Sequence, residues 1–376
     1  GEQHLNGPNE YGDMNLILTE AQKKRWDSLW GTDDYTNDLN DYVVFNDVTP
    51  TEYVTITNVE LSAALRGQLG EEHVALNADG CAVMTKHFVE SVEEVFFGYG
   101  KYTITSLEGI ELFKNLKVLS CNNTDLTDCD LSKNIKLEEI NLRIQNHLEE
   151  LDLSNLPNLK KLYCNDCDNL SNLNIEGCNN LEIIELPNCK LTGLNVSNPS
   201  KLQSLNYNHS SITLSIDELS EFTNLTELCC AGRFNGSLDI PNDMKARLTK
   251  LVCQNNQLTS LDLTEYPNLT SLECYENSLK ALNIAAASHL EELRCFGNFI
   301  PVLDVTSLTN LTNLDCGLQY DNISLILKLN DDQKSIWTNQ WKDRELNGRV
   351  YLEDEEPATE PGTNASGSDF GNGGVF

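Results

Sequence analysis

Apolar residues recur along the chain with a period of 21 to 23 residues. The best-formed copies are "LTKLVCQNNQLTSLDLTEYPN", "LTSLECYENSLKALNIAAASH" and "LEELRCFGNFIPVLDVTSLTN", and each reads L-x-x-L-x-C-x-x-N-x-L-x-x-L-x-L. The alternation around "LVC" or "LEC" predicts a short strand with two side chains pointing inward. One copy cannot bury its leucines alone, so we expect stacked copies to form a parallel sheet. The ten copies begin at Leu116, Leu137, Leu159, Leu181, Leu202, Leu225, Leu248, Leu269, Leu290 and Leu311.

This pattern resembles the leucine-rich repeat family, and especially the short repeats of internalin-like bacterial surface proteins. The resemblance covers residues 92–322. It implies a leucine-rich repeat solenoid, which is a right-handed superhelix with its parallel sheet on the concave face and α/β caps at both ends. A 21-residue copy has little room for a convex helix, so we expect short extended segments and tight turns there. The coil should be flat, with limited curvature.

Cysteine occupies the second inward position of the strand in seven of the ten copies. Leu142, Leu186 and Tyr207 hold this ladder position in the other three copies, which indicates a core site. The Cβ atoms of neighbouring strands should stay near the strand spacing of about 4.8 Å, beyond the distance that a disulfide favours. We therefore expect reduced thiols, which a thiol titration of the denatured protein can check. The seven ladder cysteines are Cys121, Cys164, Cys230, Cys253, Cys274, Cys295 and Cys316.

The sequence "CNDC", Cys164 to Cys167, has the spacing of a redox motif or of half a zinc site. Zinc would need two further ligands converging nearby. Cys167 and Cys189 fall where other copies have an asparagine such as Asn277. The family resemblance implies that a side chain at this position hydrogen-bonds to the backbone of the turn. We therefore favour a structural role and expect no metal or other cofactor.

Solenoid ends expose leucine and need caps. Residues 51–91 predict a helical N-terminal cap that contains "ALNADGCA", a degenerate version of a calcium loop. Gly80 supports the turn, but Ala75 replaces the first acidic ligand and Lys86 stands where such a loop has its bidentate glutamate. We therefore expect the loop shape without the ion, and calcium should leave the melting temperature unchanged.

A second pattern occurs near both termini. "LTEAQKKRWDSLW" matches "LNDDQKSIWTNQW", and all four tryptophans lie in these two copies. We expect strand–helix–strand units over residues 13–50 and 323–352, with each helix capped by Thr19 or Asn330. An aromatic box for sugar is one interpretation of the tryptophans; packing against the solenoid end is the favoured one. Residues 1–12 should be a flexible N-terminus, and residues 353–376 an acidic tail rich in Gly, Pro and Ser.

The charge balance narrows the possible partners. The 376 residues include 58 Asp and Glu against 26 Lys and Arg, a formal charge of -32. Such a surface repels phosphate, so we expect neither nucleic-acid nor direct membrane-surface binding. No apolar run approaches the roughly 18 residues of a membrane span. The chain opens at Gly1, and we expect a removed targeting segment. The location should be extracellular or at the cell surface, with an outer-membrane lipoprotein as one form.

The sequence offers little chemistry for catalysis. The six histidines are scattered, and no phosphate-binding loop or nucleophile motif occurs. We therefore expect a non-enzymatic binding protein that recognises a protein partner, which is an analogy of fold. Two alternatives are carbohydrate capture at the cell surface and a purely architectural spacer. Glycan-array binding would favour the first alternative, and silence in both a pull-down and an array would favour the second.

Strand alternation also predicts where a partner binds. Tyr275 and Phe296 have the same offset in adjacent copies on the concave side, so their rings should stack. We expect binding to centre on Tyr275, Arg294 and Phe296, with replacement of all three by Ala costing at least about 2 kcal/mol and barely shifting the melting temperature. The alternative is that these are isolated surface aromatics covering backbone. The other candidate contact residues are Glu273, Val252, Tyr163 and Arg143.

Overall fold

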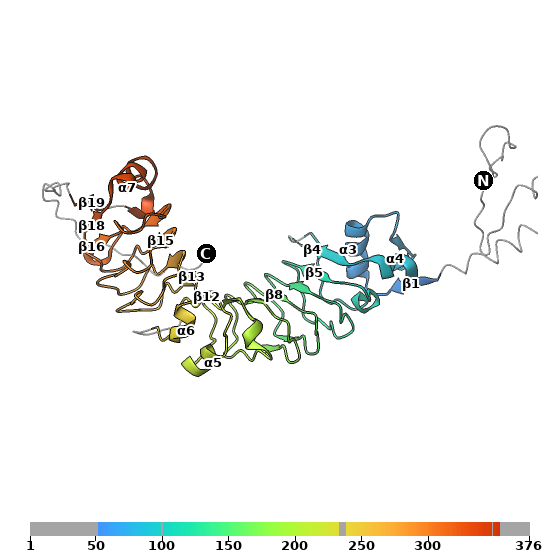
Figure 1. Ribbon diagram of the computed structural model, residues 1–376. Coiled ribbons are helices and arrows are strands. Elements are labelled where there is room, and N and C mark those ends of the chain that lie inside the picture. Colours follow the sequence, from blue (N-terminus) through green and yellow to red (C-terminus); the bar gives the residue numbers. More distant parts are fainter. Residues whose placement is uncertain (1–51, 99–100, 233–237, 348, 354–376) are drawn as a thin grey trace, which may run out of the picture.

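The computed structural model describes residues 52–98, 101–232, 238–347 and 349–353. These residues form an arc of stacked coils between two caps (Figure 1). The predictions for residues 1–12 and 13–50, and for the tail beyond Glu353, lie outside the described residues. The duplication of the strand–helix–strand unit therefore stays a prediction.

The concave side of the arc is one eleven-stranded parallel sheet, as the repeat predicts. Sheet order follows chain order, because each copy contributes one strand beside the strand of the copy before it. Pairing is in register: Leu251, Leu272 and Leu293 lie opposite one another on successive strands. The strands are β4 (Glu94–Phe97), β5 (Val118–Cys121), β6 (Glu139–Asn141), β8 (Lys161–Tyr163), β10 (Ile183–Glu185), β11 (Ser204–Asn206), β12 (Glu227–Cys229), β13 (Lys250–Val252), β14 (Ser271–Glu273), β15 (Glu292–Arg294) and β17 (Asn313–Asp315).

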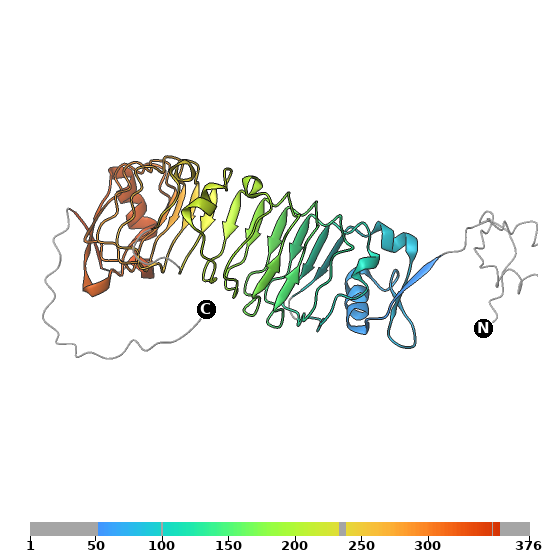
Figure 2. The same cartoon turned by 90° about the horizontal axis from the view of Figure 1, so that it is seen from below.

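The convex side is mostly extended, again as predicted. Two short parallel sheets run there, β7–β9 and β16–β18–β19. The leading leucines and the apolar residues of both sides fill the space between the layers. Figure 2 shows the strands of successive copies lying side by side along the array. The strands are β7 (Glu150–Asp152), β9 (Asn172–Asn174), β16 (Val302–Asp304), β18 (Leu325–Lys328) and β19 (Val350–Leu352), and the 3-10 turns of the array are η1 (Ile110–Leu112), η2 (Pro199–Lys201) and η3 (Tyr320–Asn322).

Two short helices depart from this plan. Helix α5 (Ile216–Ser220) and helix α6 (Asn242–Lys245) lie in the two 23-residue copies, which begin at Leu202 and Leu225. The two extra residues give room for a helical turn, and both helices lie on the outer side of the arc (Figure 1). A helix is wider than an extended segment, so it spreads the coils on the convex side. The expectation of a flat coil with limited curvature was therefore wrong.

The N-terminal cap combines helices with a small antiparallel sheet. Asn58 caps the first helix by accepting from Leu61 N at 3.0 Å, and its side chain also donates to Ser106 O in the array at 2.9 Å. Glu60 accepts from Thr105 N at 2.9 Å, which ties the same helix to the first coil. In the degenerate loop, Gly80 has φ +81°, and Lys86 forms an ion pair with Glu52 at 2.6 Å. The cap elements are β1 (Tyr53–Ile56), α3 (Val59–Leu69), β2 (Ala75–Leu76), β3 (Ala82–Thr85) and α4 (Lys86–Ser91).

The C-terminal cap has the predicted order of strand, helix and strand. Strand β18 leads into α7 (Asp331–Ile336), a π-helical turn η4 (Trp337–Trp341), the 3-10 turn η5 (Glu345–Asn347) and then β19. Asn330 caps α7 through a reciprocal pair of hydrogen bonds with Gln333. Trp337 and Trp341 are buried, as expected for core packing.

This cap also closes the last strand of the concave sheet with side chains. Trp341 Nε1 donates to Thr312 O at 3.1 Å, and Asn347 Nδ2 donates to Leu314 O at 3.0 Å. Asn347 Oδ1 accepts from Cys316 N at 2.7 Å. One asparagine amide thus supplies both a donor and an acceptor to an edge that another strand would otherwise pair with.

Candidate functional site: the concave face

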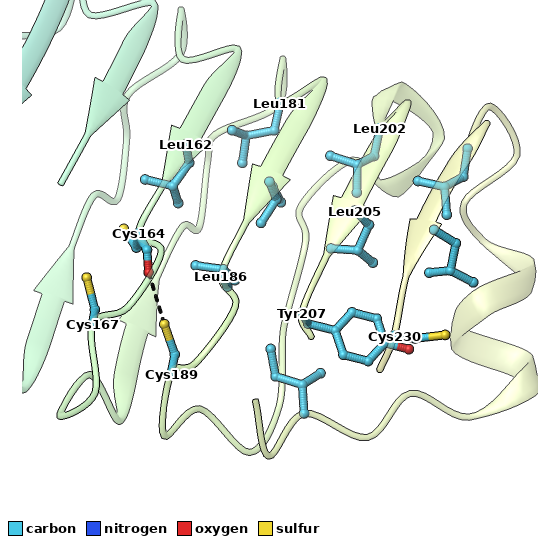
Figure 3. Close-up of a cluster of buried hydrophobic side chains, with 14 of the residues drawn as sticks. Leu162, Cys164, Cys167, Leu181, Leu186, Cys189, Leu202, Leu205, Tyr207 and Cys230 are labelled. Atoms are coloured by element: carbon cyan, nitrogen blue, oxygen red, sulfur yellow. Dashed lines mark hydrogen bonds between the residues drawn. The ribbon is translucent and has the colours of Figure 1, made fainter. Parts of the chain in front are cut away.

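The ladder thiols form the floor beneath the concave face. All seven are buried and free, in agreement with the prediction of a reduced ladder. Tyr207 and Leu186 take the same inward position in Figure 3. Burial raises the pKa of Cys253 and of Cys295 to about 12, because a thiolate loses its hydration in the core. These thiols are therefore neutral packing groups at physiological pH.

The turn after each strand is held by one side chain, and its identity differs along the array. Asn277 Nδ2 donates to Cys253 O and Cys274 O, each at 3.0 Å, and Asn277 Oδ1 accepts from Asn256 N and Leu258 N at the same distance. At the equivalent positions Cys167 Sγ donates to Leu142 O at 3.0 Å, and Cys189 Sγ donates to Cys164 O at 3.1 Å (Figure 3). The predicted turn role of Cys167 and Cys189 is thus confirmed.

The three thiols Cys164, Cys167 and Cys189 influence one another. Contact with Cys167, together with burial, raises the pKa of Cys164 and of Cys189. The S–H groups of Cys164 and Cys189 lower the pKa of Cys167 because they stabilise its thiolate. The three thiols therefore titrate as one interacting group, with the lowered pKa at Cys167.

Four predicted contact residues meet near the C-terminal end of the concave face. The rings of Tyr275 and Phe296 stack, with centroids 4.5 Å apart and planes 9° apart, as expected from their equal offset. The Arg294 guanidinium lies 5.3 Å and 5.8 Å from the two ring centroids. Arg294 bridges Glu273 at 3.3 Å and Asp315 at 3.2 Å. We call Glu273, Tyr275, Arg294, Phe296 and Asp315 the C-terminal cluster.

One expectation about this cluster was wrong. Phe296 is only 9% exposed, so it is not a free surface aromatic. Its ring stacks on Tyr275 and has the Arg294 guanidinium close by, and both neighbours exclude water from it. Replacing Tyr275, Arg294 and Phe296 together would therefore lower stability as well as any affinity.

The remaining predicted residues do not join this cluster in one site. Val252 lies opposite Glu273 in the sheet register, but it is buried, as is its neighbour Cys229. Arg143 and Tyr163 lie farther along the sheet, Arg143 in the turn after β6 and Tyr163 at the end of β8. The structure thus places the predicted residues in two groups with a buried apolar strip between them.

Arg143 and Tyr163 belong to a second group of the same composition. The Arg143 guanidinium lies 4.9 Å from the Tyr163 ring centroid and forms an ion pair with Glu185 at 3.3 Å. Asn165 accepts from Arg143 Nε at 3.2 Å and donates to Glu185 at 3.0 Å. We call Arg143, Tyr163, Asn165 and Glu185 the N-terminal cluster.

The prediction included Glu273 but missed Glu185 and Asp315, the other carboxylates that hold the two arginines. Glu185 pairs with Tyr163 in the sheet register, and Asp315 pairs with Arg294. For Asp315 the signal was present in the sequence, because a cation and an acid at equal offsets in neighbouring copies lie side by side. Glu185 lies two copies from Arg143 and at a different offset, so the repeat period does not indicate that ion pair.

Comparison with known proteins gives similarity at the level of the fold. No family model matches the sequence, and no curated protein does. The functional domain of InlJ from Listeria monocytogenes, described as including a cysteine ladder, is 19% identical with a TM-score of 0.44, covering 73% of this chain and 74% of that one. The internalin InlF from the same organism is 18% identical with a TM-score of 0.45, covering 80% and 96%. A leucine-rich repeat protein of Leptospira interrogans is 18% identical with a TM-score of 0.37, covering 67% and 81%.

These similarities concern architecture only. Bacterial leucine-rich repeat proteins, including internalins, are thus among the solved structures to which the chain is similar. The solenoid fold itself is evident from the eleven-stranded parallel sheet. Within the described part of the chain, no helix has both the length and the apolar character needed to cross a bilayer.

Proposed function

We propose that this solenoid is a non-enzymatic binding protein whose concave sheet recognises a protein partner. The observation that carries the proposal is the repetition of one arrangement on that face. An arginine lies over an aromatic ring and is held by a carboxylate, once at β6–β8–β10 and once at β14–β15–β17. Tyrosine and arginine are the residues most enriched at energetically dominant interface positions.

The spacing of the two clusters indicates an extended contact. Tyr163 ends β8 and Glu273 ends β14, five steps along the sheet order. At roughly 4.8 Å per step the clusters are about 24 Å apart. A protein surface can span that distance, and its contact area would fall within the usual range for specific complexes.

The ring geometry favours a protein over a glycan. A sugar stacks on a free aromatic face, whereas Tyr275 and Phe296 already stack on each other and have Arg294 near both rings. Catalysis is also disfavoured by where the perturbed groups lie. The strongly raised pKa values belong to buried groups such as the Cys274 thiol, which is enclosed in the core beneath the sheet.

The proposal includes a location outside the cell, at the bacterial surface or in secretions, with a lipoprotein as one form. This part of the proposal rests on the resemblance of the repeat to those of internalin-like bacterial surface proteins. Protease treatment of intact cells followed by immunoblotting tests it, since a surface protein is degraded without lysis. Protection of the protein until the cells are lysed would contradict it.

An unbiased pull-down, followed by calorimetry with the captured protein, tests the binding face. The Arg143→Ala/Tyr163→Ala and Tyr275→Ala/Arg294→Ala variants should each weaken binding by about tenfold or more. Ile216→Ala on the convex helix α5 is the matched control, because Ile216 is exposed far from the concave face. Unchanged affinity in both concave variants would contradict the proposal. Glycan-array binding without a protein partner would favour carbohydrate capture, and silence in both would favour a spacer.

A further inference from the structure

One backbone position has a left-handed conformation in every copy of the repeat. It is the second residue after the ladder position, where the chain leaves the concave strand. Most copies place Asn, Asp, His, Glu or Gly there, and Asn and Gly in particular tolerate positive φ. Ile144 and Leu318 are the two aliphatic exceptions. The ten residues are Asn123, Ile144, Asp166, Asn188, His209, Gly232, Asn255, Glu276, Gly297 and Leu318.

The two exceptions are unfavourable on two counts. A bulky residue at positive φ costs on the order of 1–2 kcal/mol. Ile144 is 41% exposed and Leu318 is 43% exposed, so burial offsets little of that cost. Backbone strain combined with an exposed apolar side chain points to a contact outside the folded chain.

Leu318 lies close to two aromatic residues along the edge of the array. Two residues later Tyr320 is 43% exposed, and its ring lies 5.3 Å from the ring of Phe299. In the preceding copy Gly297 takes the position equivalent to Leu318, so no side chain stands between Leu318 and Glu276. We call Glu276, Phe299, Leu318, Tyr320 and Asp321 the edge patch.

The negative charge of the edge patch and of the whole chain indicates what kind of partner would bind there. Glu276 and Asp321 supply two carboxylates beside the apolar side chains, while Arg349 approaches from the cap and donates to Asn322 at 2.5 Å. The whole chain has a formal charge of -32. A second copy would bring the same large negative charge, which disfavours self-association, whereas a basic partner is attracted.

We propose that the edge patch docks a basic, apolar segment of a protein partner, with Leu318 and Tyr320 as its apolar contacts. This inference rests on the proposed protein-binding function but places a second contact on the edge of the array, beside the C-terminal cluster. Leu318 keeps an unfavourable backbone conformation because the leucine side chain is needed at the contact.

Two asparagine substitutions separate this role from a packing role. Leu318→Asn and Ile144→Asn both replace an aliphatic side chain with the residue that Asn123, Asn188 and Asn255 already use at this position. Both should hold or raise the melting temperature because asparagine suits positive φ. The probe is a short fluorescent peptide that alternates leucine and lysine, measured by anisotropy on the full chain at physiological ionic strength. A serine–lysine peptide of equal charge controls for simple electrostatic attraction.

The wild-type chain should bind the leucine–lysine peptide more tightly than the serine–lysine peptide. Leu318→Asn should weaken the first interaction by about tenfold, and Ile144→Asn should leave it unchanged. Equal binding by Leu318→Asn, equal binding of the two peptides, or no binding would overturn the proposal. A lower melting temperature of Leu318→Asn would assign Leu318 to packing. Self-association lost in Leu318→Asn would identify a second copy as the occupant. The double variants of the concave face test the proposed function in a separate experiment. Failure of the edge-patch proposal can therefore be distinguished from failure of the proposed function.

Discussion

The N-terminal and C-terminal clusters contain the same residue types, but they differ in how many contacts their side chains make within the fold. In the C-terminal cluster Arg294 bridges two carboxylates, and Arg344 reaches Asp315 from the cap at 3.2 Å. In the N-terminal cluster Arg143 has one carboxylate, Glu185, and the Tyr163 ring has no stacked aromatic partner in the described part of the chain. In the C-terminal cluster the charged groups and the rings already have partners within the fold. In the N-terminal cluster the Arg143 guanidinium and the Tyr163 ring are more available to a binding partner.

The turns beneath the clusters differ in the same sense. Asn277 makes five hydrogen bonds through one amide, which links two neighbouring copies. At the equivalent place Cys167 has one S–H, which it donates to Leu142 O at 3.0 Å, with Asn165 O farther away at 3.9 Å. A thiol is a weaker donor than an amide and accepts poorly. The turn at Asn277 is therefore held more firmly than the turn at Cys167.

The largest expected difference concerns the two aromatic rings. Phe296→Ala should cost about 3 kcal/mol of unfolding free energy, because it removes a buried, stacked ring. Tyr163→Ala should cost only about 1 kcal/mol, since that ring is partly exposed and contacts mainly Arg143. Urea unfolding followed by circular dichroism measures both losses.

Phe296→Leu serves as the control because it keeps apolar volume while losing the stack. It should recover most of the loss seen with alanine. Equal losses for Phe296→Ala and Tyr163→Ala would show that the two clusters are equally open, contrary to the burial difference.

A smaller difference is expected at the turns. Asn277→Ala should cost about 2 kcal/mol because it removes the acceptor for two buried N–H groups and one of the two amide donors to each of Cys253 O and Cys274 O. Cys167→Ala should cost about 1 kcal/mol or less, as it removes one weak bond. Cys167→Asn should be neutral or stabilising if the amide reaches the same carbonyls. Thermal melts of the three variants measure these losses. A larger loss for Cys167→Ala than for Asn277→Ala would reverse the ranking of the two turns.

Much of this contrast follows from the sequence, but not all of it. The period of the repeat predicts the sheet, the ladder and the stacking of Tyr275 on Phe296, because in-register copies place equal offsets side by side. The burial of Phe296 depends on how neighbouring copies pack above the sheet, and the period does not encode that. Asn347 closes the sheet edge from 31 residues away and lies outside the repeat, so no periodic signal points to it. The helices α5 and α6 were signalled only by two extra residues per copy.

The smallest expected effect is a difference in reactivity between two thiols, Cys167 in the N-terminal part of the array and Cys253 in the C-terminal part. Cys167 should react with iodoacetamide before Cys253, although both side chains are buried and need local opening. Burial raises the pKa of Cys253 to about 12, so its thiolate fraction at pH 8 is about 1 in 10,000. The neighbouring thiols lower the pKa of Cys167, and the thiolate is the reactive form. Mass spectrometry of time-resolved alkylation measures both rates, with the partly exposed Cys81 as the fast reference. Cys189→Ala should slow the reaction of Cys167 by removing one S–H neighbour. If Cys253 reacts as fast as Cys167, the contact of Cys167 with Cys164 and Cys189 has no influence on ionisation. The two parts of the array then differ only in the hydrogen bonds of their turns.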